Sequence, residues 1–187
     1  MTSRRKSLES GGIAAGVILL AFGIAAIVMG FNGRSEVRDS LARENIVGTP
    51  DSTIPGQKGD TGSEAKAFAD VMRAHTLEIT GGQTYAEMGR FLDEDGNPTS
   101  DEAAAAVDEN GQPVENGLRN VWVTETALST ALNMSYMAEQ LALFGIVVGV
   151  ALLLSGIGFL VLALGGALRH REAAAAASGT AARPLTT

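Results

Sequence analysis

Two long stretches without a charged residue lie near the two ends of the chain, and they constrain its fold more than any other feature. The first runs from Gly11 to Phe31 and the second from Leu141 to Leu168. As α-helices they would reach roughly 31 Å and roughly 42 Å, whereas the hydrocarbon core of a bilayer is about 30 Å thick. Each stretch is therefore expected to cross a membrane once, the second with its outer end protruding.

The first stretch follows a basic start, Arg4-Arg5-Lys6, which is also found in cleaved signal peptides. Its apolar run is longer than the apolar region of a typical signal peptide, and no small-residue cleavage site follows it. We therefore expect a retained anchor.

The charge balance predicts the orientation. The segment 32–138 holds eight Lys and Arg against eighteen Asp and Glu, whereas the two ends carry mostly basic residues. Because Lys and Arg near membrane spans stay on the cytoplasmic side, both termini are expected in the cytoplasm and the acidic segment outside the plasma membrane. Nucleic acid is not an expected partner, because phosphate binding needs clustered basic residues.

These features predict an all-α membrane protein: an antiparallel two-helix transmembrane hairpin with a helical extracytoplasmic domain inserted between the spans. The predicted parts are a basic N-terminus (1–10), a first span (11–31), the outer domain (32–138), a second span (139–168) and an Ala-rich cytoplasmic tail (169–187). The chain has no cysteine, so packing alone must hold the outer domain together.

Three helices are expected in the outer domain. Leu118–Gln140 contains no Gly or Pro and should continue into the second span. Ser63 is expected to cap a helix that ends at Gly81, and the capping box Thr84-Tyr85-Ala86-Glu87 predicts a short helix over Tyr85–Arg90. An apolar stripe and nearby aromatic residues would form either a closed core or an outer cleft: Phe68, Val71, Met72, His75, Ile79, Tyr85 and Trp122.

The remaining outer segments are expected to be loops. Pro50–Gly62 is rich in Gly, Pro, Ser and Thr and is interpreted as a linker. A repeat, Asp93–Pro98 and Asp108–Pro113, predicts two exposed turns. The first copy partly resembles a calcium-binding loop, but Pro98 and Ala104 stand where that loop needs Gly and an acid, so solvated turns are favoured.

Small residues recur every seven positions in both apolar stretches, which predicts close helix packing. Antiparallel spans would pair Gly16 with Ala163, Gly23 with Gly156 and Gly30 with Gly149. Gly12-x-x-x-Gly16 and Gly145-x-x-x-Gly149 offer further small faces for a neighbouring subunit.

No catalytic, cofactor-binding or metal-binding set emerges from the sequence. The two histidines, His75 and His170, would lie on opposite sides of the membrane, so one chain cannot form a two-histidine metal site. His75 is expected to be a packed core residue. Because neither apolar stretch holds an ionisable residue, a channel or transporter is not expected either.

Residues His75–Glu87 (HTLEITGGQTYAE), with Leu132–Tyr136 (LNMSY) and the two apolar stretches, resemble a group of uncharacterised actinobacterial two-span membrane proteins. Some members carry the label aromatic ring-opening dioxygenase. Such enzymes hold iron with two histidines and a carboxylate, a set that this chain does not supply.

The sequence therefore favours a non-enzymatic structural or accessory subunit, surrounded by membrane lipids, that forms a homo-oligomer or joins a larger membrane complex. The alternative is an extracytoplasmic binding module for a lipid, a peptide or a small apolar ligand.

Overall fold

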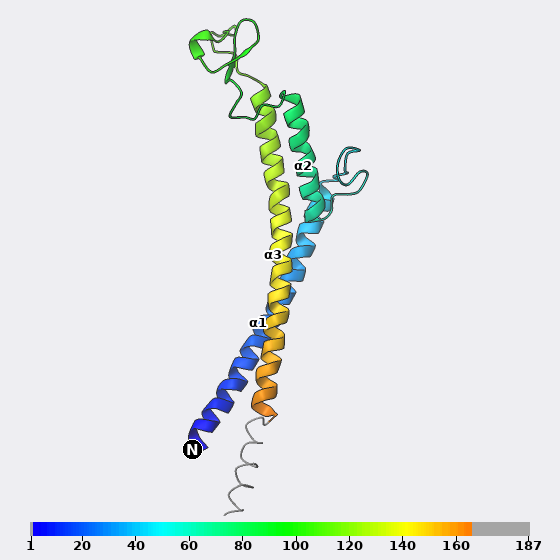
Figure 1. The fold of residues 1–187 in the computed structure, drawn as a ribbon, viewed down its shortest axis with the longest axis vertical. Helices are drawn as coiled ribbons and strands as arrows, with labels where there is room; N and C mark the ends of the chain where they lie inside the picture. Colours follow the sequence, from blue (N-terminus) through cyan, green and yellow to red (C-terminus); the bar gives the residue numbers. More distant parts are fainter. Residues whose placement is uncertain (1, 166–187) are drawn as a thin grey trace, which may run out of the picture. The chain divides into compact units, whose positions relative to one another are not determined.

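The computed structural model describes residues 2–165 and is mostly helical (Figure 1). Its elements are α1 (Thr2–Arg43), α2 (Gly62–Ile79), β1 (Phe91–Leu92), β2 (Pro98–Thr99), the 3₁₀ helix η1 (Glu102–Ala104) and α3 (Leu118–Leu164). The chain divides into two units: unit 1 takes the N-terminal part to Gly33 and the part from Leu141 onward, and unit 2 is Arg34–Gln140. The expected cytoplasmic tail lies outside the described residues.

Helices α1 and α3 are both long and apolar enough to cross a membrane. The expected continuation of the Leu118–Gln140 helix into the second apolar stretch is confirmed, because α3 runs to Leu164 without a break. Helix α1 ends at Arg43. Asn45 then takes a left-handed backbone conformation with φ of 51°, which turns the chain out of the helical path.

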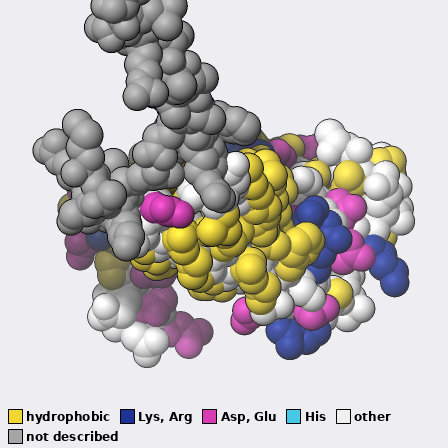
Figure 2. Space-filling view, turned by 90° about the horizontal axis from the view of Figure 1, so that it is seen from below, with side chains coloured by type: hydrophobic (Ala, Val, Ile, Leu, Met, Phe, Trp, Pro, Cys, Tyr) yellow, Lys and Arg dark blue, Asp and Glu magenta, His cyan; other side chains and the backbone are white. Residues whose placement is uncertain are grey.

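Unit 1 presents large apolar side chains on its outside. Phe22 is 65%, Met29 73% and Phe144 63% exposed. In the view from below, hydrophobic side chains gather in one broad surface (yellow in Figure 2). A surface of this kind suits a hydrocarbon environment, because exposing a broad apolar surface to water is unfavourable.

The core of unit 2 is built where the end of α1, helix α2 and the first half of α3 meet. Its buried residues are Leu41, Ala65, Ala69 and Leu132. Half-buried apolar side chains pack around them: Val37, Ile46, Phe68 and Met72. The buried face of α2 thus consists largely of small residues, which lets the three helices come close together.

Helix α2 begins one residue after its cap, Thr61, and the expectation that Ser63 caps it was wrong. The Thr61 side chain accepts the Glu64 amide, and the Glu64 carboxylate accepts the Thr61 amide in return. This reciprocal capping box stabilises the first turn. Ser63 lies two residues after the cap, inside a helix that has already started.

The segment 80–117 contains no α-helix and only the short 3₁₀ helix η1, which corrects the prediction of an all-α outer domain. Strands β1 and β2 form a small antiparallel pair, and Phe91 also pairs with Glu115. The expected helix over Tyr85–Arg90 is absent, although Glu87 does cap the Thr84 amide. The segment forms turns instead, and the Arg119 guanidinium donates to the carbonyls of Tyr85 and Met88.

Both copies of the Asp-rich repeat form exposed turns. Asp93 Oδ1 accepts the amides of Asp95 and Asn97, and Asp108 Oδ1 accepts those of Asn110 and Gln112. The Gln112 amide bond holds the pKa of the Asp108 carboxyl below its ordinary value. The carboxylates that an ion-binding loop would need are thus used as acceptors within each turn.

The segment expected to be a linker belongs to a hydrogen-bonded loop. The Gly48 amide donates to the Gln57 carbonyl (2.8 Å) and the Gly59 amide to the Ile46 carbonyl (2.9 Å). Gly48 lies directly against the Ile54 carbonyl, so a Cβ would not fit there. The loop therefore has a defined path and closes on itself.

Candidate functional site

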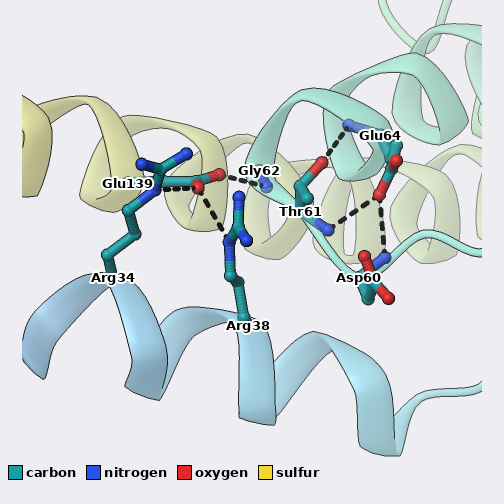
Figure 3. Close-up of polar contacts among 7 residues, drawn as sticks. All are labelled: Arg34, Arg38, Asp60, Thr61, Gly62, Glu64 and Glu139. Atoms are coloured by element: carbon teal, nitrogen blue, oxygen red, sulfur yellow. Dashed lines mark hydrogen bonds and ion pairs between the residues drawn. The ribbon is translucent and has the colours of Figure 1, made fainter. Parts of the chain in front are cut away.

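The most highly connected polar arrangement of unit 2 surrounds Glu139, a residue of α3 that is 5% exposed. Its Oε1 atom accepts from Arg34 Nε at 2.7 Å and from Arg38 Nε at 3.1 Å, both on α1. Its Oε2 atom accepts the Gly62 amide at 2.6 Å, at the start of α2 (Figure 3). These four residues are called the Glu139 junction, and they connect three helical segments through one carboxylate.

The local sequence positions each group of this junction. Arg34 and Arg38 are four residues apart, so both side chains leave the same face of α1. The capping box at Thr61 and Glu64 fixes the first turn of α2 and presents the Gly62 amide (Figure 3). A Cβ on Gly62 would lie 2.8 Å from Tyr136 Cα, so only glycine lets α2 begin this close to α3.

Sequence reasoning missed the junction, although a signal was present. Arg34 and Arg38 follow the first charge-free stretch by three and seven residues, and Glu139 precedes the second by two. An antiparallel arrangement of the two stretches brings these positions near one another. A buried carboxylate at that place needs cationic partners, and the two arginines are the nearest candidates.

Of the residues that the sequence assigned to either a closed core or an outer cleft, some are buried and others line an open groove. Val71 and Trp122 are buried, at 8% and 3% exposure. Phe68 and Met72 instead line an open groove of about 290 Å³. Further apolar lining comes from Leu41, Ile46, Leu128, Ala131 and Leu132. Unit 2 therefore has both a small closed core and an open apolar groove beside it.

Trp122 and Tyr85 are each covered by an arginine. The Trp122 indole donates to the Gln83 carbonyl at 3.0 Å, and the Arg73 guanidinium lies 5.1 Å from its ring centre. Arg119 lies 3.9 Å from the ring centre of Tyr85, which remains 44% exposed. Both aromatic rings hold the 80–117 segment to the helices.

His75 and Ile79 do not belong to the core. The His75 side chain is 41% exposed, and its Nε2 atom lies 2.6 Å from Asp51 Oδ2. Ile79 is 59% exposed at the end of α2. The expectation of a packed core histidine was wrong, because α2 buries its face of small residues and Thr76 instead.

No group of three or more His, Cys, Asp or Glu side chains that could hold a metal ion occurs within residues 2–165. His75 reaches a single carboxylate there, that of Asp51. His170 lies outside the described residues.

In unit 1 the small residues face the opposite helix, in a register that differs from the predicted one by seven residues. Gly16 lies against Gly156 and Leu160, Gly23 against Gly149 and Leu153, and Gly30 against Ala142 and Ile146. Ala163 contacts Gly12 instead of Gly16. These contacts are called the glycine interface.

Large side chains fill the space that the glycines leave. Leu160, Leu153 and Ile146 of α3 sit over Gly16, Gly23 and Gly30, while Leu20 and Ile27 of α1 sit over Gly156 and Gly149. Each glycine therefore forms a hole for a branched side chain, as in knobs-into-holes packing. The glycines also face one another in this register, Gly16 with Gly156 and Gly23 with Gly149, which brings the two helix backbones close together.

Comparison with protein-family models, with curated proteins and with solved structures gives no match to this chain.

Proposed function

We propose that the chain is a two-pass protein of the plasma membrane, with both termini in the cytoplasm and unit 2 on the outer side. Support comes from the two charge-free helical stretches, from the exposed apolar side chains of unit 1 and from the acidic balance between the stretches. In this arrangement α1 and α3 form a transmembrane hairpin, and membrane lipids surround its bulky side chains.

Within that membrane, the proposed role is that of a non-enzymatic structural or accessory subunit, with no cofactor. The Glu139 junction carries the proposal. Its carboxylate connects α1, α2 and α3. It thereby holds the three helices together, as a rigid support requires. The glycines of the glycine interface are already engaged within the chain, which leaves large side chains such as Phe22, Met29 and Phe144 for contacts with a second copy or another membrane protein.

The mass and composition of the particle extracted in a mild detergent test this proposal. A homo-oligomer, or a stoichiometric complex with another membrane protein, is the expected result. Phe22→Ala with Met29→Ala should then reduce assembly, whereas Ser100→Ala, at an exposed position of unit 2, should not. A bare monomer across a range of mild detergents would overturn the accessory role.

A second candidate function rests on the groove beside the core of unit 2. Its lining by Phe68, Met72 and Leu128 suits a lipid chain, a peptide side chain or another small apolar ligand. Ala131→Trp would fill this groove, while Ala127→Trp adds the same bulk on an exposed part of α3 outside the groove. If the groove binds a ligand, a co-purified molecule seen by native mass spectrometry should be lost with the first substitution and kept with the second.

A further inference from the structure

Helix α3 contains a second buried carboxylate, that of Glu125, which is 5% exposed. Its Oε1 atom accepts the Ser129 hydroxyl at 2.7 Å and its Oε2 atom the Thr126 hydroxyl at 3.3 Å. Both donors are neutral and come from the same helix. A carboxylate offers about four acceptor positions, so roughly half of them stay open.

Glu125 and Glu139 have the same burial on the same helix but different surroundings. Glu139 has two arginines within ion-pair distance, whereas Glu125 has none among the residues that the structure describes. The guanidinium of Arg73, on the neighbouring helix α2, lies over the Trp122 ring. A buried carboxylate without a cation is unfavourable, so a positive group placed against Glu125 would stabilise it.

Glu125 borders a depression of about 400 Å³ between α2 and α3. Thr76, Asn120 and Thr124 add polar side chains to its wall, and Met72 and Val121 add apolar ones. We propose that this depression binds a primary alkylammonium group, with the ammonium on Glu125 and the alkyl chain against Met72 and Val121. An ammonium has three donors, which suit the free acceptor positions of Glu125 and the neighbouring side-chain oxygens.

The charge of the surrounding segment agrees with this ligand. Residues 32–138 carry eighteen acidic and eight basic side chains, so the segment attracts cations and repels anions. An inorganic divalent ion fits less well, because Glu125 belongs to no group of three or more His, Cys, Asp or Glu side chains among the described residues. This inference does not depend on the proposed accessory role.

Calorimetric titration of the full chain in nanodiscs with n-butylammonium chloride tests the proposal. Saturable binding is expected, and n-butanol, which has the same alkyl chain without the charge, should bind far more weakly. Glu125→Gln keeps the size of the side chain and should weaken butylammonium binding by about tenfold or more, the loss expected for one charge-assisted contact. Glu109→Gln, in the exposed second turn of the Asp-rich repeat, makes the same charge change and should leave binding unaltered.

A second substitution guards against loss of folding. Thr76→Val preserves the shape of a buried side chain on α2 and should weaken butylammonium binding several-fold if the Thr76 hydroxyl lines the ammonium site. Arg73→Gln should not weaken it. Absence of saturable binding, equal binding by the Glu125→Gln variant, or lost binding after Arg73→Gln would each overturn the proposal.

Purification of the wild-type chain and the same two variants distinguishes two sources of the ammonium group. A second protein that co-purifies with the wild-type chain, and is lost with Glu125→Gln but kept with Glu109→Gln, would assign the ammonium to a lysine of that partner. Butylammonium binding by a particle without such a protein would assign it to a free amine.

Discussion

At the scale of single residues, the buried acids of α3 show how one side chain can hold several elements together. Glu139 is 5% exposed, and its two arginine partners remain partly open to water, with side-chain exposures of 38% and 44%. Solvent therefore weakens each ion pair, while the Gly62 amide adds a bond that water does not replace. The contribution of Glu139 comes from the whole set of contacts rather than from one pair.

Glu139→Gln should lower the free energy of unfolding of unit 2 by about 1–3 kcal/mol, less than for a fully buried ion pair because the arginines are partly solvated. The neutral amide leaves both guanidinium groups without a charged partner. Chemical unfolding in detergent, followed by Trp122 fluorescence, measures the loss, and Glu36→Gln on the exposed face of α1 is the matched control. If the effects of Glu139→Gln and Arg34→Gln simply add in the double variant, the contact does not stabilise the protein.

Acid should weaken the turn 108–112 at low pH. The Gln112 amide holds the pKa of Asp108 below its ordinary value, so the turn is most stable above the unfolded pKa of about 3.9 and loses this contribution as pH falls through the lower folded pKa. The Gln112 amide signal in NMR spectra should therefore titrate with a midpoint below that of a model peptide. Asp108→Asn should abolish the titration, and a midpoint at or above the peptide value would contradict the prediction.

At the scale of elements, the two long helices depend on glycine where they touch. A Cβ on Gly149 would lie 2.7 Å from Ile27 Cγ1 and 2.8 Å from the Gly23 carbonyl oxygen, and neither helix backbone can yield easily. Gly158 belongs to the same helix, and a Cβ there would meet nothing within 4 Å. The two glycines thus form a matched pair, one inside the glycine interface and one outside it.

Gly149→Ala should destabilise unit 1 by about 1–3 kcal/mol, the usual cost of adding bulk to a packed contact. Gly158→Ala should be neutral or slightly stabilising, because alanine favours helix more than glycine does. Thermal unfolding of both variants in the same detergent measures the difference. Equal melting temperatures would show that the glycine interface contributes nothing to stability.

The elements also show what the sequence could predict. The continuous α3 helix was predicted because Leu118–Gln140 lacks helix breakers and joins an apolar stretch directly. The helix over Tyr85–Arg90 was predicted wrongly: the segment forms turns, and Arg119, about thirty residues later, donates to the carbonyls of Tyr85 and Met88. Local rules describe local hydrogen bonds well but do not include a distant side chain that binds the same segment.

The same limit applies to the candidate sites. The seven-residue spacing predicted which glycines pack in unit 1 but not the register, because a shift of seven residues again brings small residues opposite one another. The groove in unit 2 depends on Leu41 of α1 and Leu128 of α3, which are far apart in the sequence. Glu125 gave no sequence signal, because its burial follows from the packing of α2 on α3.

At the scale of the whole molecule, membrane orientation decides on which side of the membrane unit 2 and its proposed sites lie. The absence of cysteine from all 187 residues makes it directly measurable, since each introduced cysteine would be the sole thiol of the chain. Ser7→Cys and Ser178→Cys would report on the two ends, and Ser100→Cys on the exposed segment of unit 2. All three replace a hydroxyl by a thiol of similar size.

A membrane-impermeant maleimide added to intact cells should label the Ser100→Cys variant alone, and all three variants should react once the membrane is dissolved. This outcome follows from the charge balance, because moving the ends outward would carry Arg4, Arg5 and Lys6 across the bilayer. Labelling of Ser7→Cys with intact cells would reverse the orientation and place unit 2, with its groove and its Glu125 depression, in the cytoplasm. Labelling of one end but not the other would mean that the chain crosses the membrane once, so that one apolar stretch packs against protein instead of lipid.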